Sequence, residues 1–140
     1  MGYIEKKPED CSGCLACELA CSFRHTGCFD FNKSRIRIIH DEEFSKIEIH
    51  QCVQCDEKSC VNACPVHALS VDPDLGCIRL DEDTCTGCKA CWKACTYNGV
   101  MWDEESSRPL ICDLCDGDPE CLKACKLHQA LLPADKEAVS

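Results

Sequence analysis

Short runs rich in β-branched residues occur in pairs along the chain, and each pair flanks a polar turn. These runs have the length of β-strands and partly alternate apolar with polar residues, and the Asp, Gly and Ser residues between them are typical of turns. The pattern therefore predicts three β-hairpins, formed by Arg35–His40 with Lys46–Gln51, by Ala68–Val71 with Cys77–Leu80, and by Gly99–Trp102 with Pro109–Ile111.

Cysteines occupy the segments before, between and after these hairpins, in four groups of four that we call quartets. Quartets one and three have the spacing C-x2-C-x2-C-x3-C, and quartets two and four have a longer gap between their second and third cysteines. Small or apolar residues near the ligands, such as Leu15 and Ala16, suit short helices that cover a bound group. The quartets are, in order, Cys11, Cys14, Cys17 and Cys21; Cys52, Cys55, Cys60 and Cys64; Cys85, Cys88, Cys91 and Cys95; and Cys112, Cys115, Cys121 and Cys125.

The composition leaves little material for an ordinary apolar core. The chain has 140 residues, of which 45% are hydrophobic, but this share includes 18 cysteines. Without the cysteines, about a third of the chain is apolar. Domains of this kind are usually held together by disulfides or metals. We therefore expect metal binding to be coupled to folding.

The quartet spacing identifies the metal as iron in [4Fe–4S] clusters. In C-x2-C-x2-C-x3-C the first three cysteines ligate one cluster, and the fourth ligates the neighbouring cluster of a two-cluster pair. Sixteen cysteines supply four clusters with no vacant ligand position, so the sequence predicts electron transfer without a catalytic site of its own. It contains no phosphate-binding loop and no dinucleotide fingerprint.

The order of the quartets favours a nested exchange of fourth ligands. Quartets two and three are separated by one short hairpin, so they pair first and leave quartets one and four to each other. The predicted clusters are held by Cys11, Cys14, Cys17 and Cys125; by Cys112, Cys115, Cys121 and Cys21; by Cys52, Cys55, Cys60 and Cys95; and by Cys85, Cys88, Cys91 and Cys64. The alternative is sequential pairing of quartet one with two and three with four, which the long gap from Ser22 to Gln51 makes less natural.

Disulfides and zinc are weaker interpretations of the same cysteines. The N-terminal segment MGYIEKKPEDCSGC has no apolar run and no twin arginine, which favours a cytoplasmic protein with reduced thiols. Disulfide frameworks also do not cluster their cysteines in this way. A structural zinc module usually combines two cysteine pairs separated by a spacer, whereas these quartets crowd the thiolates together. No apolar stretch is long enough for a membrane span.

The net charge of −10 disfavours nucleic acid as a partner and biases the clusters toward low potential. Redox partners are expected to offer a basic or neutral docking face. Four basic residues gather near the first hairpin, and we interpret them as a solvated face rather than a docking patch. They are Arg24, Lys33, Arg35 and Arg37.

The repeat of spacings indicates a duplicated unit in one compact body. We expect an outer module from about 8–51 plus 105–132, an inner module from about 52–104, and a tail over 133–140. Two histidines and two cysteines that could bind metal remain outside the ligand set. His67 and His128 each lie three residues after a ligand cysteine, where hydrogen bonding or packing is favoured over ligation. Cys77 suits a buried apolar position, and Cys28 is left unassigned.

The four quartets, with Pro65 after the second and CDLC opening the fourth, resemble a known family. They are similar to the four-cluster ferredoxin-like electron-transfer subunits of multi-subunit oxidoreductases, which include the beta subunits of dimethyl sulfoxide reductase and formate dehydrogenase types. The resemblance extends from Cys11 to about Leu131. It implies an α+β fold of tandem bacterial-ferredoxin-like modules, with short helices and β-hairpins packed around four clusters and fourth ligands exchanged in the nested way.

The short chain looks most like the small subunits of tungsten aldehyde oxidoreductase-family and class II benzoyl-CoA reductase enzymes. That resemblance implies a large catalytic partner with a tungsten or molybdenum pterin, a flavin- or ferredoxin-type second redox partner, and possible stacking of copies. The alternatives are a free-standing polyferredoxin, the small subunit of a dimethyl sulfoxide reductase-type molybdoenzyme, and a structural zinc module.

Overall fold

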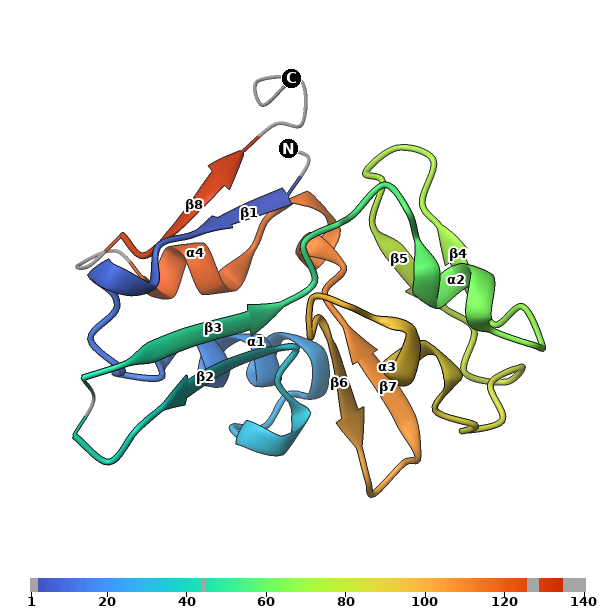
Figure 1. Cartoon of the computed structure of the whole chain (residues 1–140), viewed down its shortest axis with the longest axis horizontal. Coiled ribbons are helices and arrows are strands. Elements are labelled where there is room, and N and C mark those ends of the chain that lie inside the picture. The colour runs from blue at the N-terminus through green and yellow to red at the C-terminus, as the bar shows by residue number, and fades with distance from the viewer. Residues whose placement is uncertain (1–2, 44, 126–128, 135–140) are drawn as a thin grey trace.

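The computed structural model describes residues 3–43, 45–125 and 129–134 as short helices and antiparallel strand pairs (Figure 1). This is the composition expected of a ferredoxin-like α+β fold. The four α-helices are α1 (Ala16–Thr26), α2 (Ser59–Ala63), α3 (Ala90–Ala94) and α4 (Glu120–Ala124). Single 3-10 turns are η1 (Pro8–Asp10), η2 (Phe31–Lys33) and η3 (Leu114–Gly117).

All three predicted hairpins are confirmed. Each is an antiparallel pair of three to five residues per strand, and each pair stands apart from the others rather than joining a larger sheet. The pairs are β2 (Ile36–His40) with β3 (Ile47–Gln51), β4 (Leu69–Val71) with β5 (Ile78–Leu80), and β6 (Val100–Asp103) with β7 (Arg108–Ile111).

A fourth strand pair joins the two ends of the described chain. β1 (Tyr3–Lys6) runs antiparallel to β8 (Leu131–Ala134), with Ile4 opposite Pro133. The sequence did not predict this pair, because its two strands lie at opposite ends of the chain and no short turn joins them. Two residues of the predicted tail, Pro133 and Ala134, therefore lie in a strand, and 135–140 lie outside the described residues.

The helices pack in two pairs that are nested along the chain. α1 packs against α4, and α2 packs against α3. The strands β1, β8, β2 and β3 lie on the α1–α4 side, whereas β4 and β5 lie on the α2–α3 side (Figure 1). The first and last quartets thus lie on one side of the molecule, and the middle two lie on the other.

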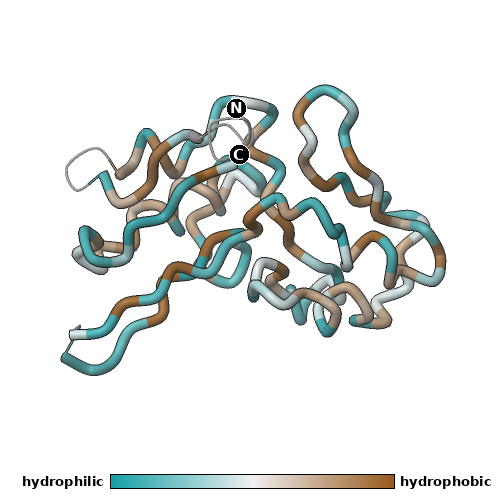
Figure 2. Tube along the Cα trace, turned by 45° about the horizontal axis from the view of Figure 1, so that its top comes forward, coloured by the Kyte–Doolittle hydropathy of each residue, from teal (hydrophilic) through white to brown (hydrophobic). Residues whose placement is uncertain are grey.

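The core consists of two small clusters of buried side chains, and cysteines form a large part of both. In the larger cluster five of ten buried residues are cysteines, and in the smaller cluster two of six are. Figure 2 shows hydrophobic residues as short segments interleaved with hydrophilic ones along the whole chain. The thin apolar core that the composition predicts is therefore found in the structure.

Candidate iron–sulfur centres

The four quartets use their helices in a similar way. In quartets two, three and four, the first two cysteines precede the helix, the third lies in its first turn, and the fourth is its C-terminal cap residue. Quartet one differs at its last position, because α1 continues past Cys21 to Thr26, where Gly27 ends it with a φ of 78°. The prediction of a short helix after Cys14 is confirmed, and the helix is longer than predicted.

The loop between the first and second cysteine shares one backbone feature in all four quartets. Its last residue is left-handed in each case, at Gly13, Gln54, Gly87 and Leu114. Left-handed backbone costs a residue with a Cβ atom about 1–2 kcal/mol, so Gln54 and Leu114 hold it only because their surroundings impose it. At Gly87 a Cβ atom would also lie 2.8 Å from a neighbouring backbone oxygen.

This loop directs a backbone N–H at the sulfur of the first cysteine in three quartets. The donors are Gly13 to Cys11 Sγ, Gln54 to Cys52 Sγ and Leu114 to Cys112 Sγ, each at 3.4 Å. Three of the fourth cysteines receive similar backbone N–H bonds, from Arg35 to Cys21 at 3.2 Å, from Ala68 to Cys64 at 3.2 Å and from Gly99 to Cys95 at 3.3 Å. Such N–H donors stabilise thiolate charge, which is the form that ligates iron. The donor set thus fits an iron–sulfur cluster.

The structure brings the predicted ligands together across quartets. One small cavity is lined by Cys64 of quartet two together with Cys85, Cys88 and Cys91 of quartet three. Burial raises the pKa of Cys60, and the nearby thiolates of Cys55 and Cys95 raise it further. The inner quartets therefore lie within electrostatic reach of each other's fourth cysteines.

The cysteines of the outer quartets, one and four, also lie close to one another. Burial raises the pKa of Cys121 to about 12, with Cys21 and Cys115 contributing in the same direction. Burial likewise raises the pKa of Cys17 well above its ordinary value, and Cys121, Cys11 and Cys125 are among the charges that add to this. Cys125 thus lies near Cys17, and Cys21 lies near Cys121.

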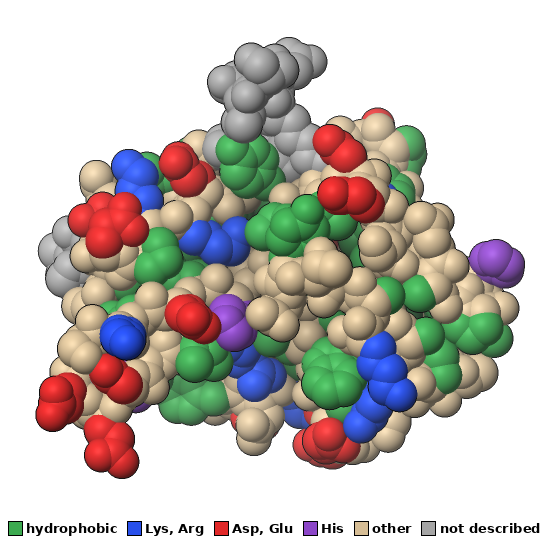
Figure 3. All heavy atoms as spheres, in the orientation of Figure 1, with side chains coloured by type: hydrophobic (Ala, Val, Ile, Leu, Met, Phe, Trp, Pro, Cys, Tyr) green, Lys and Arg blue, Asp and Glu red, His purple; other side chains and the backbone are tan. Residues whose placement is uncertain are grey.

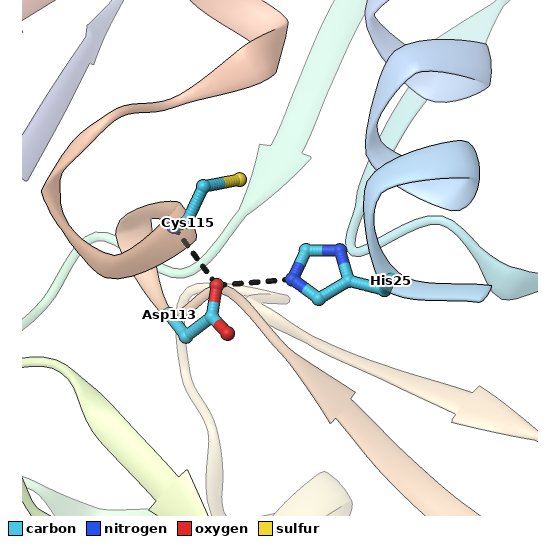
Figure 4. A group of neighbouring side chains, drawn as sticks. All are labelled: His25, Asp113 and Cys115. Atoms are coloured by element: carbon cyan, nitrogen blue, oxygen red, sulfur yellow. Dashed lines mark hydrogen bonds and ion pairs between the residues drawn. The ribbon is translucent and has the colours of Figure 1, made fainter. Parts of the chain in front are cut away.

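A partly buried histidine–aspartate pair lies beside the outer quartets (Figure 4). His25 Nε2 lies 3.0 Å from Asp113 Oδ1, and its Nδ1 lies 2.8 Å from the carbonyl oxygen of Cys21. Both partners accept only, so the ring donates from both nitrogens and carries a positive charge. Burial lowers the pKa of His25, but the hydrogen bonds to Asp113 and Cys21 together outweigh it and raise the pKa to about 9.

Asp113 in turn accepts the N–H of Cys115 at 2.9 Å, and its other carboxylate oxygen lies 3.3 Å from Arg35 Nη1. The ligand atoms of His25, Asp113 and Cys115 lie within 4.8 Å of one another, a spacing that could hold a metal ion. Because Cys115 belongs to quartet four, we interpret His25 and Asp113 as residues that position quartet four rather than as a separate metal site. Sequence reasoning missed both; the signal was a histidine one helical turn after Cys21 and the Asp inside CDLC.

Two buried glutamines also contact the outer site. Gln51 Nε2 lies 3.6 Å from Cys112 Sγ and 3.9 Å from Cys121 Sγ, and Gln54 Nε2 donates to the carbonyl of Cys112 at 3.1 Å. The Oε1 atoms of both glutamines are buried and have no hydrogen-bond partner among the described residues. Gln51 therefore connects the segment that leads into quartet two with the sulfurs of quartet four.

Three of the four basic residues near the first hairpin form internal ion pairs, which the interpretation as a solvated face did not foresee. Arg24 pairs with Asp116 at 3.4 Å. Lys33 pairs with Asp103 at 2.7 Å, and Arg35 pairs with Asp113. Their partners are more than 60 residues away along the chain, so local sequence could not reveal them.

The cysteines outside the quartets differ in burial. Cys77 is fully buried in the larger core cluster, as predicted, and Cys28 is exposed. His67 is exposed, and its left-handed backbone forms the turn that directs the Ala68 N–H at Cys64. His128 lies outside the described residues. Within the described part of the chain, no helix is long and apolar enough to cross a membrane.

Residues 44–132 match the family described as the 4Fe-4S dicluster domain. The chain is 43% identical, over 91% of its length, to the polyferredoxin-like subunit of an aliphatic sulfonate oxidoreductase from Pyrococcus furiosus, of which it spans 72%. It is 39% identical, over 89% of its length, to the beta subunit of the NADH-dependent phenylglyoxylate dehydrogenase of Aromatoleum evansii, of which it spans only 28%.

A third relative is the putative electron transport protein YsaA of Escherichia coli. It is 35% identical over 98% of this chain, which spans 92% of that protein. Among solved structures, the active-site complex BamBC of benzoyl coenzyme A reductase with benzoyl-CoA contains a similar chain. The TM-score is 0.53 and the identity 26%, over 92% of this chain and 76% of the other.

Proposed function

Because the chain belongs to the 4Fe-4S dicluster domain family and is an iron–sulfur electron-transfer subunit, we propose that it relays single electrons through four [4Fe–4S] clusters between a catalytic oxidoreductase subunit and a second redox partner. One observation carries the proposal. In all four quartets the residue before the second cysteine has a left-handed backbone, and at least one backbone N–H donates to a cysteine sulfur of each quartet. The clusters supply the one-electron chemistry, and the chain supplies spacing, insulation and hydrogen bonds.

We propose the nested ligand sets given above. Quartet one shares its fourth ligands with quartet four, and quartet two shares them with quartet three. The packing of α1 on α4 and of α2 on α3 supports this exchange, as does the cavity that Cys64 lines together with Cys85, Cys88 and Cys91. Cys21 lies near Cys115 and Cys121 of quartet four, whereas sequential pairing would require Cys21 to bind the cluster of quartet two.

The same nesting supports a tandem arrangement of two ferredoxin-like modules. The outer module would contain α1, α4 and the strands β1, β8, β2 and β3, and the inner module would contain α2, α3, β4 and β5. The hairpin β6–β7 connects them, because β6 follows quartet three and β7 leads into quartet four.

For the catalytic partner we propose a large subunit with a tungsten or molybdenum pterin, of the aldehyde oxidoreductase type. The relatives support an oxidoreductase complex: one is a subunit of an aliphatic sulfonate oxidoreductase, and another belongs to a benzoyl coenzyme A reductase active-site complex. A free-standing electron carrier is the alternative, and the relative of similar length named an electron transport protein favours it. Co-purification with a pterin-containing subunit under anaerobic conditions separates the two.

The test of the proposed function is metal analysis of anaerobically isolated protein. Four clusters require roughly sixteen iron and sixteen acid-labile sulfide atoms per chain. Two clusters, or zinc without sulfide, would contradict the proposal, and zinc would support a structural module instead.

A further inference from the structure

A groove on the surface of the inner side lies between the β2–β3 hairpin and the α3–β6 segment. The β2–β3 hairpin contributes Arg37 and His50 to its lining. The other side is lined by Trp92 and Lys93 of α3, by Cys95 directly after α3, and by Trp102 of β6, among others. Figure 3 shows hydrophobic and basic side chains next to one another over α3 and β6. The groove is thus formed by two regions that are distant in sequence.

The charge of this groove is opposite to that of the whole chain. The chain has 25 acidic residues and a net charge of −10, but no Asp or Glu is among the described residues that line the groove. Arg37 donates to the carbonyl oxygens of Ser34 and Asn32, and neither Arg37 nor Lys93 forms an ion pair within the described part of the chain. Their positive charges are therefore available to a partner.

Exposed aromatic surface lies beside these charges. Trp92 is 47% exposed although it follows a buried ligand cysteine. Lys89 Nζ lies 5.8 Å from the ring centroid of Trp92 and 5.4 Å from that of Trp102, which holds the two indoles beside one ammonium group. Tryptophan and basic residues that remain exposed together are typical of the centre of a protein interface.

The groove also reaches the redox site. Cys95 lines it, and Cys91 directly precedes Trp92. In the nested sets, Cys95 and Cys91 belong to the two different inner clusters. A partner seated on Trp92 is therefore close to both of them.

We propose that this groove docks a redox protein with an acidic face, which exchanges one electron with the inner clusters. This inference rests on the proposed function and reverses, for this one face, the expectation of a basic or neutral partner. In the exchange the holoprotein loses one electron, the oxidised partner gains it, and no bond on this chain forms or breaks. A second groove, lined by Cys55 with Glu5, Asp56 and Glu57, contains three acidic residues, so the two faces differ in the partner charge that they favour.

The test uses charge reversal at Lys93 with a control at the equivalent position of quartet four. Lys93 and Lys123 each follow the third cysteine of a quartet by two residues. Lys123 does not line the groove and pairs with Asp118 and Glu120. Lys93→Glu and Lys123→Glu therefore change the net charge equally. Lys93→Gln is the milder companion.

Anaerobic holoprotein, reduced with titanium(III) citrate and freed of it, is mixed with an oxidised acidic flavodoxin, and the flavin semiquinone is followed by stopped flow. At low salt, Lys93→Glu should lower the second-order rate constant about tenfold, Lys93→Gln should lower it less, and Lys123→Glu should leave it within about twofold of wild type. With a basic cytochrome c as acceptor, Lys93→Glu should not slow the transfer.

Equal effects at both lysines, or no effect at Lys93, would overturn the groove assignment. So would slower transfer to both acceptors, because that points to damage of the inner clusters. Sedimentation gives a further check. If the wild-type protein is a dimer and Lys93→Glu is a monomer, the groove binds a second copy of the chain, and the proposal is overturned. If wild-type protein contains no reducible iron, the proposed function fails instead, so the two failures are distinguishable.

Discussion

The outer and inner halves of the molecule use similar cysteine spacings but bury their ligands to different degrees. Here the outer half means quartets one and four with α1 and α4, and the inner half means quartets two and three with α2 and α3. Five of the eight outer cysteines are buried, and two of the eight inner ones are. The buried cysteines are Cys17, Cys21, Cys112, Cys115 and Cys121 in the outer half, and Cys60 and Cys91 in the inner half.

The difference comes from the elements around each half. The outer half has an α-helix of eleven residues, the paired strands β1 and β8, and the ion pairs around Asp113, whereas the inner helices have five residues each. One N–H of β2, that of Ile38, even donates to the buried carboxylate of Glu18 in α1. Similar ligand motifs are thus buried more deeply in the outer half than in the inner half.

Removal of iron is expected to have the largest effect and to abolish the difference between the halves. Since cysteines form half of the larger core cluster, loss of the metal removes the groups that hold them together. When iron is removed from the anaerobic protein with a chelator, the apoprotein should no longer show a cooperative thermal transition by circular dichroism. An apoprotein with a native spectrum and a sharp transition would contradict this.

Loss of one fourth ligand should remove one cluster from a chosen half. Under nested exchange Cys125→Ala damages the cluster of Cys11, Cys14 and Cys17, and Cys95→Ala damages that of Cys52, Cys55 and Cys60. Each variant should lose roughly a quarter of the iron. Under sequential pairing Cys125→Ala would damage the Cys85 cluster, and Mössbauer spectra of double variants with Cys14→Ala or Cys88→Ala distinguish the two outcomes.

A core substitution in the outer half should be costly only on the buried face of its strand. Ile36 is fully buried against Cys17 and Cys21, whereas Ile39 on the same strand is 46% exposed. Ile36→Ala should lower the free energy of unfolding of the holoprotein by about 2–5 kcal/mol, and Ile39→Ala by less than about 0.5 kcal/mol. Thermal midpoints under nitrogen measure the difference; similar losses at both positions would refute the assignment of the core.

A single amide should set part of the potential of an outer cluster. The side-chain amide of Gln51 donates to the sulfurs of Cys112 and Cys121, and this donor stabilises the reduced cluster. Gln51→Leu removes the donor. The expected shift is roughly 20–60 mV to lower potential, the one-electron equivalent of a hydrogen bond that contributes about 0.5–1.5 kcal/mol.

The control for this shift is Gln54→Leu, since Gln54 donates to a carbonyl and Leu114 shows that leucine accepts the same left-handed conformation. Redox titrations monitored by electron paramagnetic resonance give both values. An equal shift in the two variants would show that general packing, rather than the Gln51 donor, sets the potential.

The smallest effect is expected at the cysteines outside the quartets. Cys28 is exposed, so Cys28→Ser should leave the iron content and the thermal midpoint unchanged. Cys77→Ser places a hydroxyl in the larger core cluster and should lower the midpoint. Loss of iron in Cys28→Ser would give that cysteine a role in metal binding.

The parts of the structure that the sequence predicts well are the local ones. Hairpin turns such as Asp72–Gly76 and the spacing of Cys85 to Cys95 specify conformation within a few residues, and the structure reproduces both the hairpins and the loop geometry. The pairing of β1 with β8 and the contacts of His25 and Gln51 with the outer cysteines depend on segments far apart in sequence. Residue type and spacing give only a weak signal of such contacts, such as the place of His25 one helical turn after Cys21, because a histidine or glutamine at those positions is equally compatible with solvent.

The nested exchange of ligands is tested most directly by crystals of the anaerobic holoprotein, with an anomalous difference map recorded at the iron edge. We expect four iron–sulfur sites per chain, with Cys125 at the site of Cys11, Cys14 and Cys17, and Cys95 at the site of Cys52, Cys55 and Cys60. Two sites only, or four sites with Cys64 at the first and Cys125 at the site of Cys85, would contradict the account.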